Sequence, residues 1–296
     1  MIPAARPLVS RPVRVTSPYG LITSVGLPTG DDPHWLMGVR TEIGTCGPAT
    51  VTTASCAVTG TGDLIKLDAL SVRGVSAFTV YGSPTCGTPG FIDDAVKYAT
   101  DALLSGEGRA VEREFWTGTA GTTPHLAANV AVTGSDGAIE QTAAVIVSGA
   151  PLTGVDPVEG LARLEEALGW CYGAEGVIHA PNSVITHWDA FSLLRRDGLK
   201  LRSPSNHIVV NGNGYPGTAP DGTGPATGLR WVYATGAVDL RRGPVETMST
   251  ANAEILDRAK NDVAVFAHRT YVITWDCCHL AIPIKIGGIA ADAFGA

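Results

Sequence analysis

The chain has 296 residues, of which 45% are hydrophobic and only 17% are charged, with 36 glycines and 19 prolines. The apolar content argues against disorder along the whole chain, and the many turn residues favour a strand-rich protein with a sparsely charged surface. The formal net charge is −7 and no run of Lys and Arg is present, which argues against tight binding to nucleic acid.

The first 45 residues contain several prolines and predict an extended arm without a helix, which we expect to contribute little to the folded subunit. They lack the apolar core of a secretory signal. The longest apolar stretch, near the C-terminus, is interrupted by Pro283, Lys285 and a glycine pair, so no membrane span is expected.

The next segments predict strands and then a long helix. Residues 50–81 show partial alternation, which predicts a hairpin whose strands are VTTASCAV and ALSVRGVSAFTVY. A helix is expected from Ile92 to Trp116, because Asp93 and Asp94 suit a first turn and apolar residues recur at helical spacing.

The clearest helix follows Asp156, which is a good N-cap before Pro157 at the first helical position. Its expected apolar face consists of Val158, Leu161, Leu164 and Leu168. After a strand in GVIHA, a second helix should begin at Pro181 or Asn182 and end at Gly198. Strands are then expected in LKLR, HIVVNG and WVYATGAVDL. Residues 252–261 are expected to form a short helix or a long turn. The chain should close with two long strands, DVAVFAHRTYVITWD and HLAIPIKIG.

One glycine motif of the G-x-G-x-x-G type occurs, from Gly212 to Gly217. It follows a strand, as a dinucleotide-binding loop does, but Pro216 and the Pro/Gly/Thr run after it cannot open the helix that would meet a pyrophosphate. We therefore interpret it as a surface loop.

Six cysteines lie at positions 46, 56, 86, 171, 277 and 278 and form no C-x-x-C pair. We expect buried thiols in a protein made in a reducing cytoplasm. A metal site that includes Cys277, Cys278 and His279 is a weaker alternative, because successive side chains on a strand point to opposite faces.

The other candidate acid–base residues carry no catalytic pattern. His179 and His187 have no neighbouring carboxylate that would mark a base, and Glu165–Glu166 and Glu112–Glu114 are expected on solvated helix faces. The sequence thus predicts no catalytic, cofactor-binding or metal-binding residue. An enzyme of unrecognised type, with a metal or Cys/His site, remains an alternative.

The order of these segments resembles the major capsid protein of tailed bacteriophages, whose Hong Kong 97-type fold is also used by encapsulins. The resemblance lies in LLSGEGRAVEREFWTGTAGTTPHL, in DPVEGLARLEEALGWCYGAEGVIHAPNSVITHW, in KLRSPSNHIVVNGNGYPG, in WVYATGAVDLRRG and in NDVAVFAHRTYVITWD. It implies an α+β fold with an N-terminal arm (1–45), an extended β-hairpin loop (46–90), a peripheral domain with a spine helix (91–150 and 241–296) and an axial domain (151–240).

The resemblance further implies a structural subunit that forms hexamers and pentamers of itself in an icosahedral virion shell, assembled in the host cytoplasm. Portal, scaffolding and decoration proteins are candidate further partners, and an encapsulin-like compartment shell is the nearest alternative. No catalysis, cofactor, specific nucleic-acid binding or membrane contact is implied. One member of the family forms a covalent crosslink that needs a Lys on this loop, an Asn on a neighbouring subunit and a catalytic Glu. Lys66 is the only lysine in the expected loop, and no matching Asn and Glu are identified, so we do not expect this crosslink here. The charges of the spine helix, including Glu107, Glu112 and Glu114, are expected to contact neighbouring subunits.

Overall fold

The computed structural model describes residues 17–25, 33–44, 46, 71–82, 85–86, 92–248, 256–257 and 262–287. Its helices are α1 (Leu21–Ser24), η1 (Pro33–Met37, a 3-10 helix), α2 (Ile92–Thr117), α3 (Pro157–Cys171) and α4 (Asn182–Ala190). The first strands are β1 (Val39–Ile43), β2 (Ser71–Val75), β3 (Ala77–Gly82), β4 (Thr85–Cys86), β5 (Val132–Thr133), β6 (Ile139–Gln141) and β7 (Val145–Ile146). The later strands are β8 (Val177–Pro181), β9 (Arg195–Asp197), β10 (Lys200–Arg202), β11 (Ile208–Gly212), β12 (Leu229–Thr235), β13 (Val238–Arg242), β14 (Glu246–Met248), β15 (Leu256–Asp257), β16 (Asp262–Ala264), β17 (Phe266–Trp275) and β18 (His279–Lys285).

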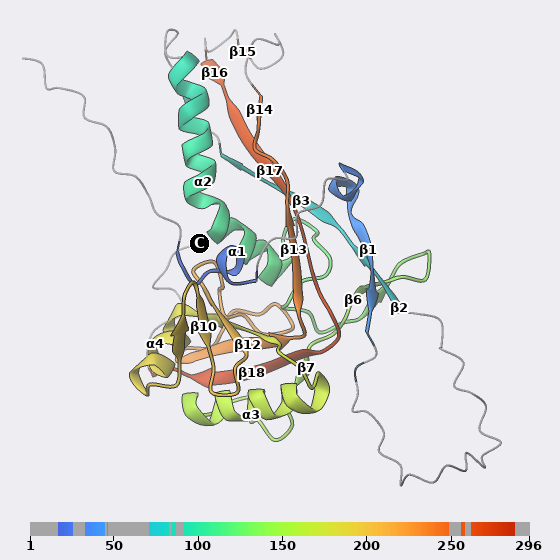
Figure 1. The fold of residues 1–296 in the computed structure, drawn as a ribbon, viewed down its shortest axis with the longest axis vertical. Coiled ribbons are helices and arrows are strands. Elements are labelled where there is room, and N and C mark those ends of the chain that lie inside the picture. The colour runs from blue at the N-terminus through green and yellow to red at the C-terminus, as the bar shows by residue number, and fades with distance from the viewer. Residues whose placement is uncertain are drawn as a thin grey trace, which may run out of the picture.

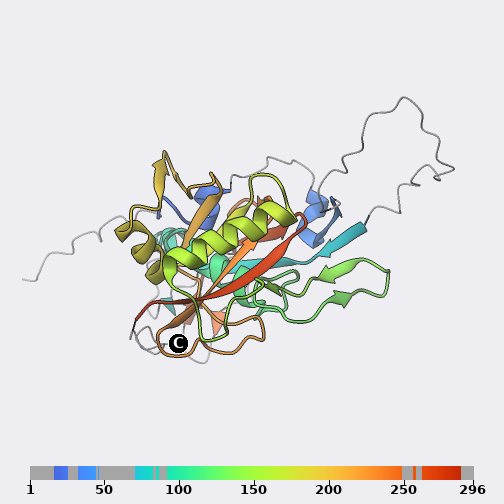
Figure 2. The same cartoon turned by 90° about the horizontal axis from the view of Figure 1, so that it is seen from below.

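A seven-stranded mixed sheet forms one end of the molecule, in the order β7-β18-β12-β8-β11-β10-β9. Helix α3 lies against this sheet (Figures 1 and 2) and buries Leu161, Leu164 and Leu168 in the same core as the sheet residues Ile178 and Val209. The expected cap is confirmed, because the carboxylate of Asp156 accepts the backbone N–H of Val158 at 2.9 Å. The side chain of Val158, by contrast, is exposed and does not belong to the apolar face.

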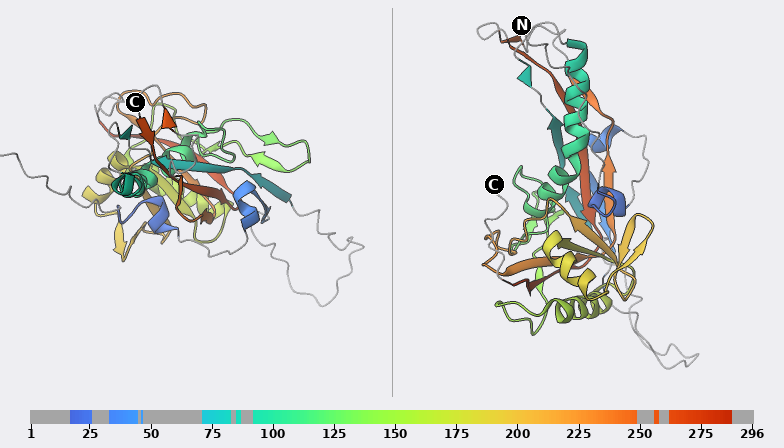
Figure 3. Two further views of the ribbon diagram at one scale, coloured as in Figure 1. Left: turned by 90° about the horizontal axis from the view of Figure 1, so that it is seen from above. Right: turned by 90° about the vertical axis from the view of Figure 1, so that its left-hand side faces the viewer.

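The long helix α2 runs beside the long strand β17, and together they extend away from the seven-stranded sheet (Figures 1 and 3). Strand β17 pairs with β13 and β14 and, separately, with β3. Side chains of α2 at four-residue intervals are buried, namely Ala99, Leu103, Glu107, Val111 and Phe115. Because residues four apart share a helix face, these five side chains form a buried stripe that includes one carboxylate. Glu112 and Trp116, each next to a member of this stripe, are buried as well.

The extended hairpin has a different first strand from the predicted one. Strand β2 pairs antiparallel with β1, with Val39 opposite Val75 and Ile43 opposite Ser71. The predicted partner, VTTASCAV at 51–58, lies outside the described residues. Strand β3, predicted to continue the second strand of the hairpin, pairs instead with β17. The ribbon is therefore formed by residues 39–43 and 71–75, and its first strand lies in the segment expected to be an arm.

The expectation that the arm adds little to the subunit is wrong for residues 17–25. Leu21 in α1 is fully buried in the core that also contains Phe115 and Trp231. The backbone carbonyl of Tyr19 accepts the N–H of Asn211 in β11 at 2.9 Å. This part of the arm is helical and packed because its apolar side chain fills space between α2 and the seven-stranded sheet.

Three further expectations are revised. Helix α4 ends at Ala190 rather than Gly198, since Ser192 has a φ of 58° and residues 195–197 form β9, which pairs with β10. Residues 256–257, expected in a helix or turn, form β15. Strand β18 pairs with β12 in the seven-stranded sheet, so 279–285 share a sheet with the proposed axial segment rather than with 241–275.

The predicted bounds of α2 agree with the structure to within one residue, and the expected strand at 279–287 forms as β18. The expected long strand at 262–276 is divided at Val265 into β16 and β17, which belong to different sheets. None of the helices in the described segments combines the length and the apolar character needed to cross a lipid bilayer.

Candidate functional site

Glu112, on the spine helix α2, joins three parts of the chain. It projects from α2, is 3% exposed, and accepts hydrogen bonds from the backbone N–H of Leu21 at 3.0 Å and of Gly214 at 2.9 Å. Its expected role on a solvated, subunit-facing surface is therefore wrong. The carboxylate connects the arm, the spine helix and the loop after β11, and so it stabilises the fold of a single subunit.

Burial raises the pKa of Glu112 to about 7, although backbone hydrogen bonds from Leu21, Gly214 and Asn213 act in the opposite direction. An unfolded glutamate titrates near 4.5. Between these two pH values the folded subunit binds more protons than the unfolded chain. Its stability should therefore fall as the pH rises from about 4.5 to 7 and become level above this range.

We expect the contribution of Glu112 to the free energy of unfolding to decrease by roughly 1 kcal/mol between pH 6 and pH 8. Chemical denaturation of the wild type and of Glu112→Gln at both pH values measures it. The Gln variant should lose this part of the pH dependence, whereas Glu114→Gln on the same helix should keep it. Equal pH dependence in the wild type and Glu112→Gln would show that burial does not shift the titration of Glu112.

Glu107 forms a second buried charge cluster higher on the same helix. Its carboxylate accepts from Arg269 Nη1 at 2.8 Å and from the Tyr271 hydroxyl at 2.6 Å, both on β17. Arg242 Nη1 of β13 lies 3.7 Å away. The predicted contact of this residue with a neighbouring subunit is also wrong, because Glu107 is 6% exposed and its partners belong to the same chain.

The glycine motif forms a loop that packs on the spine helix. A Cβ atom at Gly214 would lie 2.2 Å from the carbonyl oxygen of Arg109 and 2.9 Å from the backbone nitrogen of Arg113. The glycine is therefore required by close contact between two backbones. No helix begins after Gly217 up to β12, as the sequence predicted.

The buried histidines belong to the core. His179 on β8 lies 3.1 Å from both the Tyr215 hydroxyl and Thr235 Oγ1, and burial lowers its pKa to about 3. Burial likewise lowers the pKa of His279 to about 4. Both imidazoles are thus neutral near pH 7 and take part in packing and hydrogen bonding. His187, which carries no catalytic pattern in the sequence, has its Nδ1 atom 2.7 Å from the Ser183 carbonyl oxygen on its own helix.

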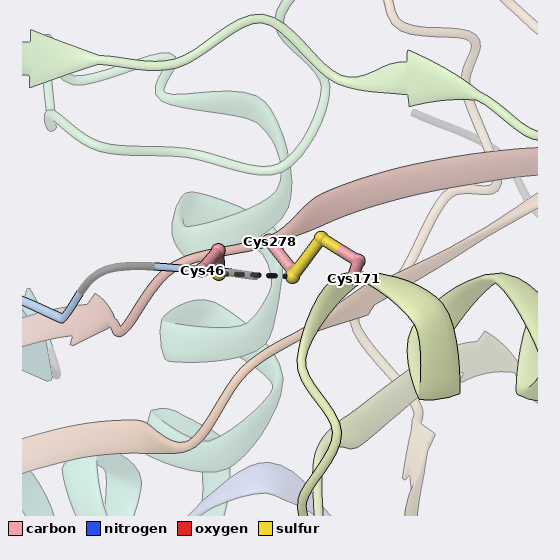
Figure 4. Close-up of side chains that lie close together, drawn as sticks. All are labelled: Cys46, Cys171 and Cys278. Atoms are coloured by element: carbon pink, nitrogen blue, oxygen red, sulfur yellow. Dashed lines mark hydrogen bonds between the residues drawn. A yellow bond between two sulfur atoms is a disulfide. The ribbon is translucent and has the colours of Figure 1, made fainter. Parts of the chain in front are cut away.

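Four of the six cysteines meet at the turn between β17 and β18, which differs from the expected separate buried thiols. Disulfides join Cys46 to Cys277 and Cys171 to Cys278. Figure 4 shows Cys46, Cys171 and Cys278 close together, with 3.1 Å between the Sγ atoms of Cys46 and Cys278. Cys56 lies outside the described residues, and the Cys86 backbone pairs in β4 with β16.

Sequence reasoning missed both the Glu112 junction and the cysteine cluster. Glu112 was hidden because it sits among charged residues of α2, and only its position between Val111 and Phe115 marks a buried face. The cysteines come from segments more than 100 residues apart, so their spacing carries no signal.

No family model matches this sequence, and no curated protein matches it. Among solved structures, the capsid of the native GTA particle is 12% identical, covers 95% of each chain and gives a TM-score of 0.52. The capsid of Ralstonia phage GP4 is 11% identical, covers 96% of each chain and gives 0.49. The capsid of Helicobacter pylori bacteriophage KHP30 is 10% identical, covers 97% of this chain and 95% of that chain, and gives 0.48.

The fold of this chain is assigned from the native GTA capsid, which gives the highest TM-score of these three, 0.52, over 95% of both chains. The described elements also follow the expected order of a ribbon, a spine helix beside a long strand, and a compact α/β unit. The chain therefore has the α+β fold of the Hong Kong 97-type capsid proteins.

Proposed function

We propose that this chain is a major capsid protein, the structural subunit of the icosahedral head shell of a tailed bacteriophage or a related particle. The observation that carries the proposal is the capsid fold over nearly the whole chain length. The proposed partners are further copies of the chain, arranged as hexamers and pentamers. The proposed location is the virion shell, assembled in the host cytoplasm, where portal, scaffolding and decoration proteins would attach.

The proposed domains correspond to the separate sheets of the structure. The seven-stranded sheet, which includes β7 and β18 as well as the strands of 151–240, serves with α3 and α4 as the axial domain. Helix α2 with β3, β13, β14 and β17 forms the spine of the peripheral domain, and the β1–β2 ribbon begins the extended loop. Strands β6 and β5 of the same chain extend this ribbon to a sheet in the order β1-β2-β6-β5, so that β1 is its outer strand among the described residues. An edge strand offers unpaired backbone groups, which supports a contact of β1 with a neighbouring subunit.

Large apolar side chains on the surface support self-association. Trp170 at the end of α3 is 75% exposed, and Met37 beside the ribbon is 92% exposed. Phe191, directly after α4, and Leu199, between β9 and β10, are also exposed. Permanent interfaces between subunits bury such residues, and a second copy of the chain would cover them in a shell.

The geometry supports no catalytic role for the residues considered above. His179 and His279 are buried and neutral near pH 7, and Glu107 and Glu112 are hydrogen-bonded within the subunit. We therefore propose a structural protein without an active site.

Trp170→Ala should weaken assembly and leave the subunit intact, because substitutions of exposed residues usually change stability by less than about 0.5 kcal/mol. The matched control is Trp188→Ala, since Trp188 is fully buried on α4 and its truncation should cost about 3–5 kcal/mol. Denaturation curves and the assembled fraction after gel filtration measure the two effects. Wild-type assembly of Trp170→Ala would exclude this side chain from the subunit interface.

Sedimentation velocity of the purified chain tests the function itself. A capsid subunit should form a fast-sedimenting species of many copies, well separated from the 30.6 kDa monomer. A chain that remains a monomer or dimer at every concentration and salt tested, and in the presence of the products of its neighbouring genes, would contradict the proposal.

A further inference from the structure

The cysteine cluster brings four sulfur atoms together from three separate segments. Cys46 follows β1, Cys171 ends α3, and Cys277 and Cys278 form the turn between β17 and β18. The Sγ atoms of Cys46, Cys171 and Cys278 all lie within 4.8 Å of one another, and Cys277 is bonded to Cys46. Each of the four cluster residues is partly or largely exposed, and none of them is fully buried.

The adjacent cysteines can serve one site because they are not part of a regular strand. Strand β17 ends at Trp275 and β18 begins at His279. Cys278 has a φ of 67°, in the left-handed region that residues other than glycine rarely adopt. The turn therefore removes the alternation that would otherwise point the two side chains to opposite faces.

The backbone around the cluster is held by hydrogen bonds as well as by the disulfides. Asp276, directly before Cys277, accepts the backbone N–H of Gly44 at 2.8 Å and lies 3.4 Å from the Tyr172 hydroxyl. These two partners are near neighbours of Cys46 and Cys171 in the sequence. The backbone N–H of Gly236 also donates to the Cys277 carbonyl at 3.0 Å. One carboxylate thus connects all three segments, and these bonds do not require oxidised sulfur.

We propose that, when its two disulfides are reduced, the cluster formed by Cys46, Cys171, Cys277 and Cys278 is a four-thiolate zinc site. Zinc prefers four sulfur ligands in a tetrahedron, and a Zn–S distance of about 2.3 Å places the sulfur atoms about 3.8 Å apart. The sulfur atoms that already lie within 4.8 Å of one another would need only small shifts to reach this spacing. The inference goes beyond shell formation and does not depend on it.

The chemistry balances with an external thiol reductant. Each disulfide takes up two electrons and two protons from one dithiol, which becomes a disulfide, so that two dithiols yield four cysteine thiols. Binding of Zn²⁺ then releases four protons and leaves a site with a net charge of −2. Arg73 offsets part of this charge, since Nη1 of Arg73 donates to the carbonyls of Trp275 and Asp276 in the same turn.

The test uses the full chain, reduced with a metal-free dithiol that is removed by gel filtration, then incubated with Zn²⁺ and desalted. Mass spectrometry of the metal content should find about one zinc per chain, and an untreated oxidised sample should hold far less. Co²⁺ in place of Zn²⁺ should give the absorption of a tetrahedral thiolate complex. Reduced wild-type protein that retains its circular dichroism spectrum but holds no stoichiometric zinc would overturn the proposal.

Single variants identify the ligands. Cys171→Ser and Cys278→Ser should each lose stoichiometric zinc on desalting, because each variant lacks one of the four sulfur ligands. Cys86→Ser is the matched control, because the Cys86 backbone lies in a different sheet, and it should bind like the wild type. If Cys171→Ser and Cys278→Ser keep wild-type affinity, the zinc lies elsewhere and the assignment is wrong. A rise in melting temperature with zinc, present in Cys86→Ser and absent in folded Cys171→Ser, provides a second measurement.

Discussion

Replacement of Glu107 by alanine is expected to lower the free energy of unfolding of the subunit by about 3–5 kcal/mol. The carboxylate is 6% exposed and is hydrogen-bonded to Arg269 and Tyr271, and the Arg269 side chain is itself only 11% exposed. Removal of one partner leaves a buried guanidinium without its counter-charge, and this loss exceeds the net value of the original pair. Urea denaturation monitored by tryptophan fluorescence measures the change.

The control is Arg113→Ala, since Arg113 is an exposed residue of the same helix. This variant should change stability by less than about 0.5 kcal/mol. Tyr271→Phe removes only the hydroxyl donor and should lie between the two, at about 1 kcal/mol. A loss below about 1 kcal/mol for Glu107→Ala would mean that water reaches Arg269 and that the cluster is not a buried one.

The second large effect is expected at Gly82, the last residue of β3. An alanine Cβ there would lie 2.4 Å from the Leu103 nitrogen and 2.7 Å from the Ala99 carbonyl oxygen on α2. Both atoms belong to the helix backbone, so no side-chain rotation relieves the overlap. The strand must move away from the spine helix, and we expect a loss of about 3 kcal/mol together with reduced assembly.

Gly106→Ala on the spine helix is the matched control for Gly82→Ala. A Cβ atom at Gly106 meets no atom within 4 Å, and alanine has the higher helix propensity. This variant should therefore gain up to about 1 kcal/mol. Thermal melting distinguishes the two substitutions. Similar melting temperatures for Gly82→Ala and the wild type would show that β3 does not pack against α2 as closely as described.

Local signals in the sequence were sufficient to predict the main helices. Asp156 before Pro157 marks the start of α3, and the acidic pair before an apolar stripe marks α2. These features depend on residues within one or two turns, where capping and periodicity act directly. The overall fold followed from the order of such segments and not from any single motif.

Long-range pairing could not be predicted in the same way. The sequence predicts VTTASCAV as the partner of the second hairpin strand, whereas 71–75 pair with 39–43. No local signal reveals this pairing, because register depends on partners far along the chain. The helix stripe likewise does not reveal that Glu107 and Glu112 are buried, since their partners Arg269 and Gly214 are more than 100 residues away. Buried carboxylates on an apparently solvated helix face are recognised only when the elements that cover them are known.

Electron microscopy of the purified chain shows whether it assembles into capsid shells. We expect closed icosahedral shells whose reconstruction accommodates the subunit with α2 as its spine and with the β1–β2 ribbon against a neighbouring copy. Trp170→Ala at the same concentration should show fewer closed shells. Fields that contain only single subunits, or particles whose density does not fit α2 beside β17 in the repeating unit, would contradict the assignment of this protein as a capsid subunit.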